Sequence, residues 1–318
     1  MFWSMTEDTL TYIWIQIESL DIEYWKWVAW MIYPVILSFL LPLIIPILVY
    51  CCAIFLHVYQ YRHRLRDAYV HDFWDGAKKT VAVFWEAQGR IWHGFEIVGL
   101  DRIPDSGPAM IIYYHGALPM DFYYVMAKCL LQKQRQIHAV GDNFLFNIPG
   151  FRLMMDVFCI SPGTVHSCAH VLEDGHILAI APGGVREAQF GDEYYQVMWG
   201  NRYGFAKVAI STKVPIIPMF TRNIRESLRT PGWGRSSLRW LYEKCRLPIV
   251  PIYGLFPVKL TTYFGPPIYP DESMTPEELA QKVKQGIEAL ISEHQIVPGN
   301  ILRALSERVT GDNDLKFN

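Results

Sequence analysis

Hydrophobic positions follow two different patterns along this chain of 318 residues. Between Trp27 and Tyr61 there is no Asp, Glu, Lys or Arg. Because a membrane-spanning helix needs about 20 apolar residues, this run is ample for one span and short for two spans with a turn. Pro34, Pro42 and Pro46 interrupt it, and proline kinks or ends a helix. The pattern therefore predicts a membrane-embedded helical segment, either a kinked single span or a hairpin dipping into one leaflet.

Farther along, short apolar runs alternate with segments of helical periodicity. Strand-like runs occupy residues 110–114, 136–140, 156–160, 177–181, 214–220 and 257–264. Helical patterns occupy residues 119–132, 164–174, 202–212, 236–245 and 276–293. The last of these begins with Thr275 as N-cap, Pro276 in the first turn and Glu278 completing a capping box. Strands that alternate with helices predict an α/β fold with a mixed sheet flanked by helices.

These patterns divide the chain into five segments. They are an acidic N-terminal segment (1–26), a membrane segment (27–61), a linker helix (62–94), an α/β domain (95–295) and a C-terminal tail (296–318). The acidic leader argues against a signal peptide, which needs a basic one. Arg62, Arg64 and Arg66 follow the membrane segment, and basic residues beside a span stay in the cytosol. We therefore expect the α/β domain to face the cytosol.

Composition narrows the expected partners. Hydrophobic residues make up 51% of the chain and its formal net charge is -2. A chain of this charge, without a polybasic tail, has no overall attraction to nucleic acid, whereas its apolar content favours membrane lipids. The six cysteines contain no Cys-x-x-Cys pair, so reduced thiols are expected.

A histidine stands where one apolar run ends. His115 follows the run 110–114, and Asp121 lies six positions later, beyond a turn at Gly116 and Pro119. A neutral imidazole there could take a proton from a hydroxyl while the carboxylate orients it. Such a pair also arises by chance about once in a chain of this composition, so the alternative is a turn histidine near a helix start.

A glycine turn stands where another apolar run ends. Gly183 and Gly184 follow the run 177–181 and precede Arg186 and Glu187. Consecutive glycines let backbone N–H groups converge on an anion, and arginine adds a planar fork of donors. A tight turn with a solvated arginine is the alternative interpretation.

Four blocks in a fixed order resemble those of the glycerolipid acyltransferases, the PlsC-like group. His115 and Asp121 are similar to the first block (His-x4-Asp), residues 156–162 stand where the second lies, 182–186 resemble the third (Phe-Pro-Glu-Gly-Thr-Arg), and 214–218 resemble the fourth. The resemblance spans roughly residues 95–292, and four ordered blocks are far more specific than one. Residues 183–188 and 200–207 also resemble the mono- and diacylglycerol acyltransferase branch.

The resemblance implies a membrane-bound O-acyltransferase of the endoplasmic reticulum that makes triacylglycerol from mono- or diacylglycerol. His115 would be the general base and Asp121 its orienting partner. Substrate would bind at Gly183, Gly184, Arg186 and Glu187. Acyl-CoA would be the co-substrate, with no bound cofactor and no metal.

Three departures from the family pattern bear on the acceptor. Five residues rather than four separate His115 from Asp121, Pro162 and Gly163 replace an arginine of the second block, and Gly183 replaces a glutamate of the third. Because those two missing side chains serve a phosphate-bearing acceptor in the family, the resemblance favours a neutral acceptor here. A lysophospholipid acyltransferase and a non-catalytic membrane lipid-binding protein remain the alternatives.

Two other groups of residues lie outside these blocks. Arg and Lys side chains, interleaved with Trp233 and Trp240, make residues 222–246 locally basic. This region suits lipid headgroups or coenzyme A phosphates, or it is a solvated helix with inward tryptophans. His166 and His170 have helical metal-ligand spacing, yet no third ligand is in reach, so no metal is expected.

Overall fold

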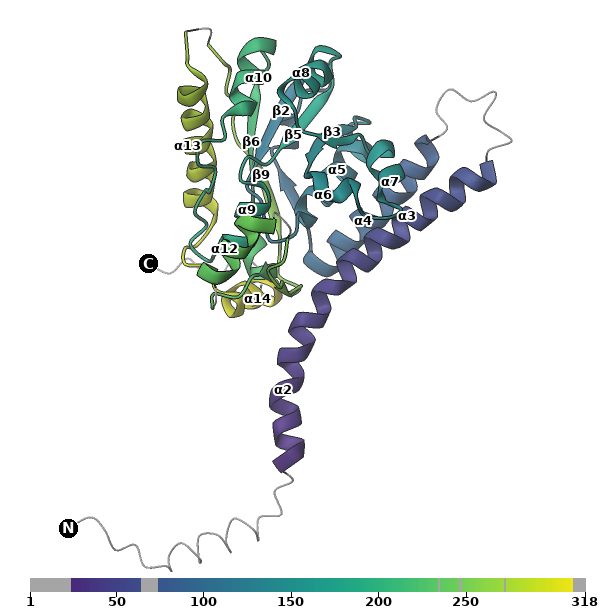
Figure 1. Cartoon of the computed structure of the whole chain (residues 1–318), viewed down its shortest axis with the longest axis vertical. Coiled ribbons are helices and arrows are strands. Elements are labelled where there is room, and N and C mark those ends of the chain that lie inside the picture. Colours follow the sequence, from purple (N-terminus) through teal and green to yellow (C-terminus); the bar gives the residue numbers. More distant parts are fainter. Residues whose placement is uncertain (1–23, 64–73, 234, 246–247, 272, 311–318) are drawn as a thin grey trace, which may run out of the picture.

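A mixed sheet lies at the centre of the computed structural model, which describes residues 24–63, 74–233, 235–245, 248–271 and 273–310 (Figure 1). In spatial order its strands are β1 (Glu96–Val98), β9 (Thr261–Phe264), β6 (Ile216–Arg222), β2 (Ala109–Tyr113), β5 (Ile177–Ile180), β3 (Ile137–Gly141) and β4 (Ile160–Pro162). The strands from β6 to β4 run parallel, and β9 pairs antiparallel with β6. The predicted α/β class with a mixed sheet is confirmed.

Helices cover both faces of this sheet. The connection from β2 to β3 contains α5 (Met120–Gln132), whereas α8 (Val165–Glu173) connects β4 back to β5 in the opposite direction. Because such crossovers are right-handed, the two helices lie on opposite faces. Helix α4 (Asp75–His93) packs beside α5, and α10 (Gly204–Thr212) packs beside α8 and α13 (Pro276–His294). All five residues of β2 are buried in consequence.

The first half of the apolar run stands apart from the sheet. Helix α2 (Tyr24–Leu40) passes through a 3-10 turn, η1 (Leu41–Leu43), into α3 (Ile44–His63), and the chain does not reverse (Figure 1). Residues 26–60 form one stretch of 35 residues that is long and apolar enough to cross a membrane. On α2, large side chains such as Trp27, Trp30 and Tyr33 are exposed. Nothing within the described ranges covers this surface.

The second half of the run packs on the domain. Ile45, Val49, Ala53 and Leu56 recur at helical spacing along α3 and are buried. They face α7 (Phe151–Val157) and α4. The apolar run therefore has two roles, because α3 belongs to the core of the domain whereas α2 extends away from it.

The structure differs from the sequence patterns at several short elements. Residues 156 and 157 end helix α7, and strand β4 begins only at Ile160, so the predicted strand over 156–160 is wrong except at its last residue. The buried residues of α7 are Phe151, Met154, Met155 and Val157, and this helix packs against α3. That packing stabilises a helix where the sequence pattern indicated a strand. Elements without a predicted counterpart are β1, η3 (Leu100–Arg102), α6 (Asn143–Phe146), α7, α9 (Gly184–Phe190), α11 (Ile224–Ser227), β7 (Leu228–Arg229), β8 (Tyr253–Gly254) and α14 (Ile301–Thr310).

Two predicted segments fall partly outside the described residues. The acidic leader is described only from residue 24, and residues 64–73 of the expected linker helix and 311–318 of the tail also lie outside. Within the described part, the linker region contains α4, whose first residue is Asp75, and the tail contains α14.

Candidate active site

The candidate residues meet where three parallel strands end. His115 lies two residues after β2, the glycine turn follows β5, and Arg225 follows β6 in the short helix α11. Since β2 pairs with both β5 and β6 in parallel, their carboxyl ends open at one edge of the sheet. Open α/β sheets bind ligands at this edge. The topology thus assembles side chains that are up to 110 positions apart.

His115 is held as a neutral imidazole. Its Nδ1 lies 2.6 Å from the carbonyl oxygen of Gly116, which can only accept, so Nδ1 carries the proton. Burial, with a smaller contribution from the charge of Arg225, lowers the pKa of His115 to about 4 against the raising influence of the Gly116 carbonyl. The side chain nevertheless keeps part of its surface exposed. In this tautomer Nε2 presents a lone pair, as a general base requires.

Asp121 is buried in the first turn of α5 and is only 1% exposed. Neither carboxylate oxygen makes a hydrogen bond of ordinary geometry with a described residue. Burial raises the pKa of Asp121 to about 6, against a weaker lowering influence of the Thr221 hydroxyl. A carboxyl group buried without such bonds is costly in its charged form.

The expected contact between His115 and Asp121 is absent from the described structure. The imidazole Nδ1 is engaged by Gly116, and no hydrogen bond or ion pair joins the two side chains. The extra residue in the 115–121 interval is the physical reason, since the chain turns at Gly116 before α5 begins and the nearest carbonyl becomes the partner. Gly116, rather than Asp121, therefore selects the histidine tautomer in this structure.

Glu187 lies inside the site and does not face solvent. Its Oε2 accepts a hydrogen bond from the backbone N–H of His115, and its Oε1 accepts one from that of Met198, both at 2.9 Å. Burial raises its pKa to about 6. We expected Glu187 to bind substrate, but each of its carboxylate oxygens already accepts a backbone hydrogen bond. Glu187 thus fixes the backbone of the candidate base.

Gly183 makes room for that carboxylate. A Cβ at position 183 would collide with the carboxyl group of Glu187. Glu187 therefore places its carboxylate in the space beside Gly183, the position at which the glycerolipid acyltransferases have a glutamate. Gly184 adopts φ +50°, a left-handed conformation that favours glycine, and its N–H donates to Ala181 at 3.0 Å. The amide of Gly184 is consequently engaged within the turn.

Two arginines flank the glycine turn. Arg202 donates from Nη1 to the carbonyl oxygens of Pro182 and Gly183, at 3.1 and 2.8 Å, and so holds the turn. Arg186 has a buried Nε without a hydrogen-bond partner among the described residues. A guanidinium that keeps an unused donor beside the turn suits an anionic ligand or an oxyanion.

Arg225 is the central residue that sequence reasoning missed. It was grouped with an exposed basic region, yet it is 0% exposed. Its side chain donates to the carbonyl oxygens of His115 at 2.9 Å, Glu187 at 2.5 Å and Ala188 at 3.0 Å. It also donates from Nε to the Tyr114 hydroxyl at 3.1 Å. One buried guanidinium therefore ties β2 to α9.

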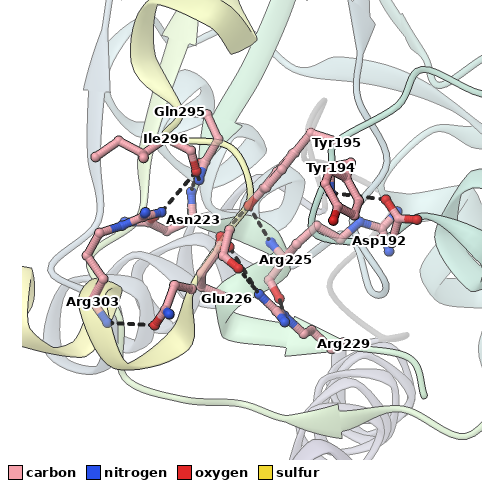
Figure 2. Close-up of polar contacts among 12 residues, drawn as sticks. Asp192, Tyr194, Tyr195, Asn223, Arg225, Glu226, Arg229, Gln295, Ile296 and Arg303 are labelled. Atoms are coloured by element: carbon pink, nitrogen blue, oxygen red, sulfur yellow. Dashed lines mark hydrogen bonds and ion pairs between the residues drawn. The ribbon is translucent and has the colours of Figure 1, made fainter. Parts of the chain in front are cut away.

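Other polar residues hold α11 in place (Figure 2). The hydroxyl of Tyr195 accepts from the backbone N–H of Arg225 at 3.0 Å and donates to the carboxylate of Glu226. Arg229 reaches that carboxylate at 3.3 Å and donates to the Gly299 carbonyl at 2.8 Å. Arg225 lies three residues after the apolar strand β6, and this location was the sequence signal that could have identified it as part of the site.

No metal-binding cluster accompanies these side chains. Within the described ranges, no three His, Cys, Asp or Glu side chains lie close enough together to hold a metal ion. The described arrangement combines a neutral imidazole, a buried carboxyl group and an arginine with an unused donor, and these groups suit proton transfer from a hydroxyl with charge stabilisation nearby.

Comparison with known proteins places this geometry among enzymes. Residues 94–222 match the family model described as Acyltransferase. Proteins named "DGAT1/2-independent enzyme synthesizing storage lipids" are 52% identical in both Bos taurus (93% of this chain, 88% of that protein) and Homo sapiens (93% and 91%). The solved 1-acyl-sn-glycerophosphate acyltransferase PlsC from Thermotoga maritima is 18% identical, with a TM-score of 0.48 over 76% of this chain and 96% of that one.

Proposed function

This chain belongs to the acyltransferase family, and we propose that it makes storage lipid by moving a fatty acyl group from acyl-CoA to the hydroxyl of mono- or diacylglycerol. The product would be triacylglycerol when the acceptor is diacylglycerol. The observation that carries the proposal is the neutral His115, whose Nδ1–H is held by Gly116 and whose Nε2 can accept a proton.

The proposed reaction needs no intermediate on the protein. Nε2 of His115 takes the proton of the acceptor hydroxyl as its oxygen attacks the thioester carbonyl carbon. The C–S bond then breaks, and the thiolate of coenzyme A takes the proton from the imidazolium, so that His115 ends the cycle neutral. The buried carboxyl group of Asp121, once ionised, would favour the imidazolium through its charge. Arg186, with its unused Nε, is the proposed donor to the oxyanion.

A neutral acceptor is consistent with the charges of the site. The family's phosphate-serving arginine is replaced by Pro162 and Gly163 in the second block. The carboxylate of Glu187 is buried and accepts hydrogen bonds from two backbone N–H groups, so it is held inside the protein and adds no positive charge for a phosphate. Acylglycerols need only their hydroxyl to be held near Nε2, and their chains can stay in the lipid phase.

We also propose that α2 lies in the endoplasmic reticulum membrane with the domain on the cytosolic side. At 1.5 Å per residue its 17 residues reach about 26 Å, close to the roughly 30 Å of a bilayer core. Its large exposed apolar side chains would then face lipid instead of water. Acceptor and product would enter and leave through the same membrane.

The decisive experiment compares wild type with His115→Ala and His115→Gln in membranes from cells that lack other triacylglycerol synthesis. Labelled acyl-CoA is offered with diacylglycerol or with a lysophospholipid. Because general-base catalysis contributes about 10²–10⁴-fold, both variants should lose at least 99% of transfer while keeping the wild-type unfolding midpoint. Transfer only to the lysophospholipid would refute the neutral acceptor. Equal turnover by wild type and variants would refute His115 as the general base, and absence of transfer by the wild-type protein to either acceptor would support a lipid-binding role instead.

A further inference from the structure

Helix α12 (Arg235–Cys245) directs large apolar and basic side chains away from the protein. Trp240 is 58% exposed, Leu241 43%, and Trp233, just before the helix, 75%. Arg239 is partly exposed, and Nζ of Lys244 lies 3.9 Å from the centre of the Trp240 ring. We call these five residues the α12 face. Exposed apolar side chains that gather with cations mark an interaction surface.

The opposite side of α12 is packed against the candidate active site. Leu238 and Tyr242, one turn apart, pack with Phe190 of α9, the helix that follows the glycine turn. The rings of Phe190 and Tyr242 meet edge to face, with centroids 5.7 Å apart. Arg235 forms an ion pair with Asp192 at 3.2 Å. The α12 face is therefore held at a fixed place relative to the site.

Helix α12 lies at the end of the domain from which α2 extends (Figure 1). The ring of Phe39, near the end of α2, lies 5.7 Å from that of Tyr253. Tyr253 in turn lines a cavity of about 200 Å³ together with Gly232 and Arg235. The base of the apolar helix and the start of α12 thus adjoin through this cavity.

We propose that the α12 face rests on the surface of an anionic lipid bilayer, the same bilayer that α2 enters. The α12 face adjoins the apolar surface of α2, and this continuity identifies lipid as what covers it. Charge points to anionic lipid, because α12 carries three basic residues (Arg235, Arg239 and Lys244) and one acidic residue (Glu243). Tryptophan and lysine are the side chains that favour the headgroup region, and basic residues are drawn to anionic lipid. The inference rests on the proposed membrane location of α2.

A consequence for the site follows from this orientation. With α2 in the bilayer and α12 on its surface, the carboxyl edge of the sheet faces the lipid. An acylglycerol hydroxyl then approaches His115 from the membrane, and its acyl chains need not cross water. The same contact assigns a role to Arg239 and Lys244 of the basic region, whereas Arg225 is buried and Arg229 is held by Glu226 and Gly299.

The test uses the full-length protein in phosphatidylcholine vesicles that contain phosphatidylserine. An environment-sensitive fluorescent amino acid replaces Trp240, Tyr269 or Leu37 in separate samples, and spin-labelled lipid serves as the quencher. Leu37 reports on α2. Tyr269 is 68% exposed and lines a cavity with Lys213, which precedes β6, so it reports on the opposite edge of the sheet. We expect quenching at positions 37 and 240, and none at position 269.

Charge variants add a second measurement with a matched control. Each reversal, Arg239→Glu or Lys244→Glu, changes the charge by two units and should weaken the contact of the α12 face with phosphatidylserine-containing vesicles about 30-fold, read as loss of quenching at position 240. Lys282→Glu makes the same charge change on an exposed residue of α13 near Tyr269 and should leave docking unchanged.

The outcomes separate this inference from the proposal on which it rests. Quenching at position 37 without quenching at 240 overturns the α12 contact and leaves the membrane helix in place. Absence of quenching at both positions overturns both. A shift in the fluorescence emission of the label at position 240 that persists in detergent and depends on protein concentration would assign the α12 face to a second copy of the chain. This result would also overturn the proposal.

Discussion

Replacing Arg225 tests whether a buried guanidinium holds the candidate base in place. Arg225→Lys keeps the positive charge but removes the planar fork, which reaches carbonyl groups on two different elements. A single ammonium group can be centred on one of these carbonyls and not on the whole set. The substitution therefore changes geometry while leaving the net charge of the site unaltered.

The magnitude follows from the contacts. The side chain of Arg225 donates to three carbonyl oxygens and one hydroxyl. If lysine loses two of these bonds, each worth about 1.5 kcal/mol for a charged donor, the domain loses about 3 kcal/mol. For a domain of this size each kcal/mol lowers the unfolding midpoint by about 2–4 °C, so we expect a drop of about 6–12 °C.

Thermal unfolding of the full-length protein in detergent, followed by circular dichroism, measures this drop, and acyl transfer by the same samples measures its effect on the site. Arg239→Lys is the matched control, because Arg239 is exposed and pairs with Glu243 at 3.5 Å. A surface pair of this kind is worth about 0–1 kcal/mol, so the control should stay near wild type. An Arg225→Lys midpoint within about 2 °C of wild type would refute the reasoning.

Three further predictions concern the remaining site residues. Asp121→Asn should abolish most transfer and stabilise the protein by about 1–3 kcal/mol above pH 6. The pKa of Asp121 is about 6 in the folded protein and 3.8 in the unfolded chain. The cost of burying its charge is therefore absent below about pH 4 and grows as the pH rises to 6. A gain that increased on acidification would contradict this sign. Because ionisation of Asp121, whose pKa is raised to about 6, also shapes the wild-type pH profile, the pKa of His115 is read from the residual activity of Asp121→Asn. Since burial lowers the pKa of His115 to about 4, kcat/KM of that variant should still be on its plateau at pH 6.5, and a midpoint near 6.5 would argue against the buried base. Gly183→Ala should displace the Glu187 carboxylate, lower the free energy of unfolding by about 1–3 kcal/mol and slow acyl transfer at least tenfold. Gly232→Ala is the control, because a Cβ there meets only open space, and it should behave as wild type. Equal behaviour of the two variants would exclude the steric argument.

The parts of the fold that the sequence predicted well are those with strong local patterns. Strands β2, β5 and β6 are apolar runs bounded by turn residues, and α13 carries a complete capping box, in which Thr275 and Glu278 exchange hydrogen bonds. Strands β1, β7 and β8 have only two or three residues each, too few for a periodic pattern. Their pairing depends on partners far away in the chain.

The candidate site shows the same division. His115, Asp121 and the glycine turn could be identified because each stands beside a recognisable apolar run. Arg225 could not be separated from its basic neighbours, because the hydrogen-bond partners of its side chain lie 37 to 111 positions away and only the folded sheet brings them together. The direct contact between His115 and Asp121 could not be decided either. With one extra residue in the turn, the imidazole Nδ1 bonds to the backbone carbonyl of Gly116 instead of the carboxylate.

With α2 in the proposed membrane location, the helical segment from α2 through η1 to α3 would connect the bilayer to the edge of the sheet that carries the candidate site. Because buried side chains fix α3 against α7 and α4, the domain cannot swivel freely about the base of α2. A span of about 26 Å is slightly shorter than an average bilayer core, and such mismatch is relieved by tilting or by local thinning of the lipid. In the proposed membrane location, a tilt of α2 would act on the sheet through η1 and the packed helix α3. We therefore expect membrane thickness to set the height of His115 above the lipid surface, so that turnover in defined bilayers depends on acyl-chain length even when the substrates are held constant.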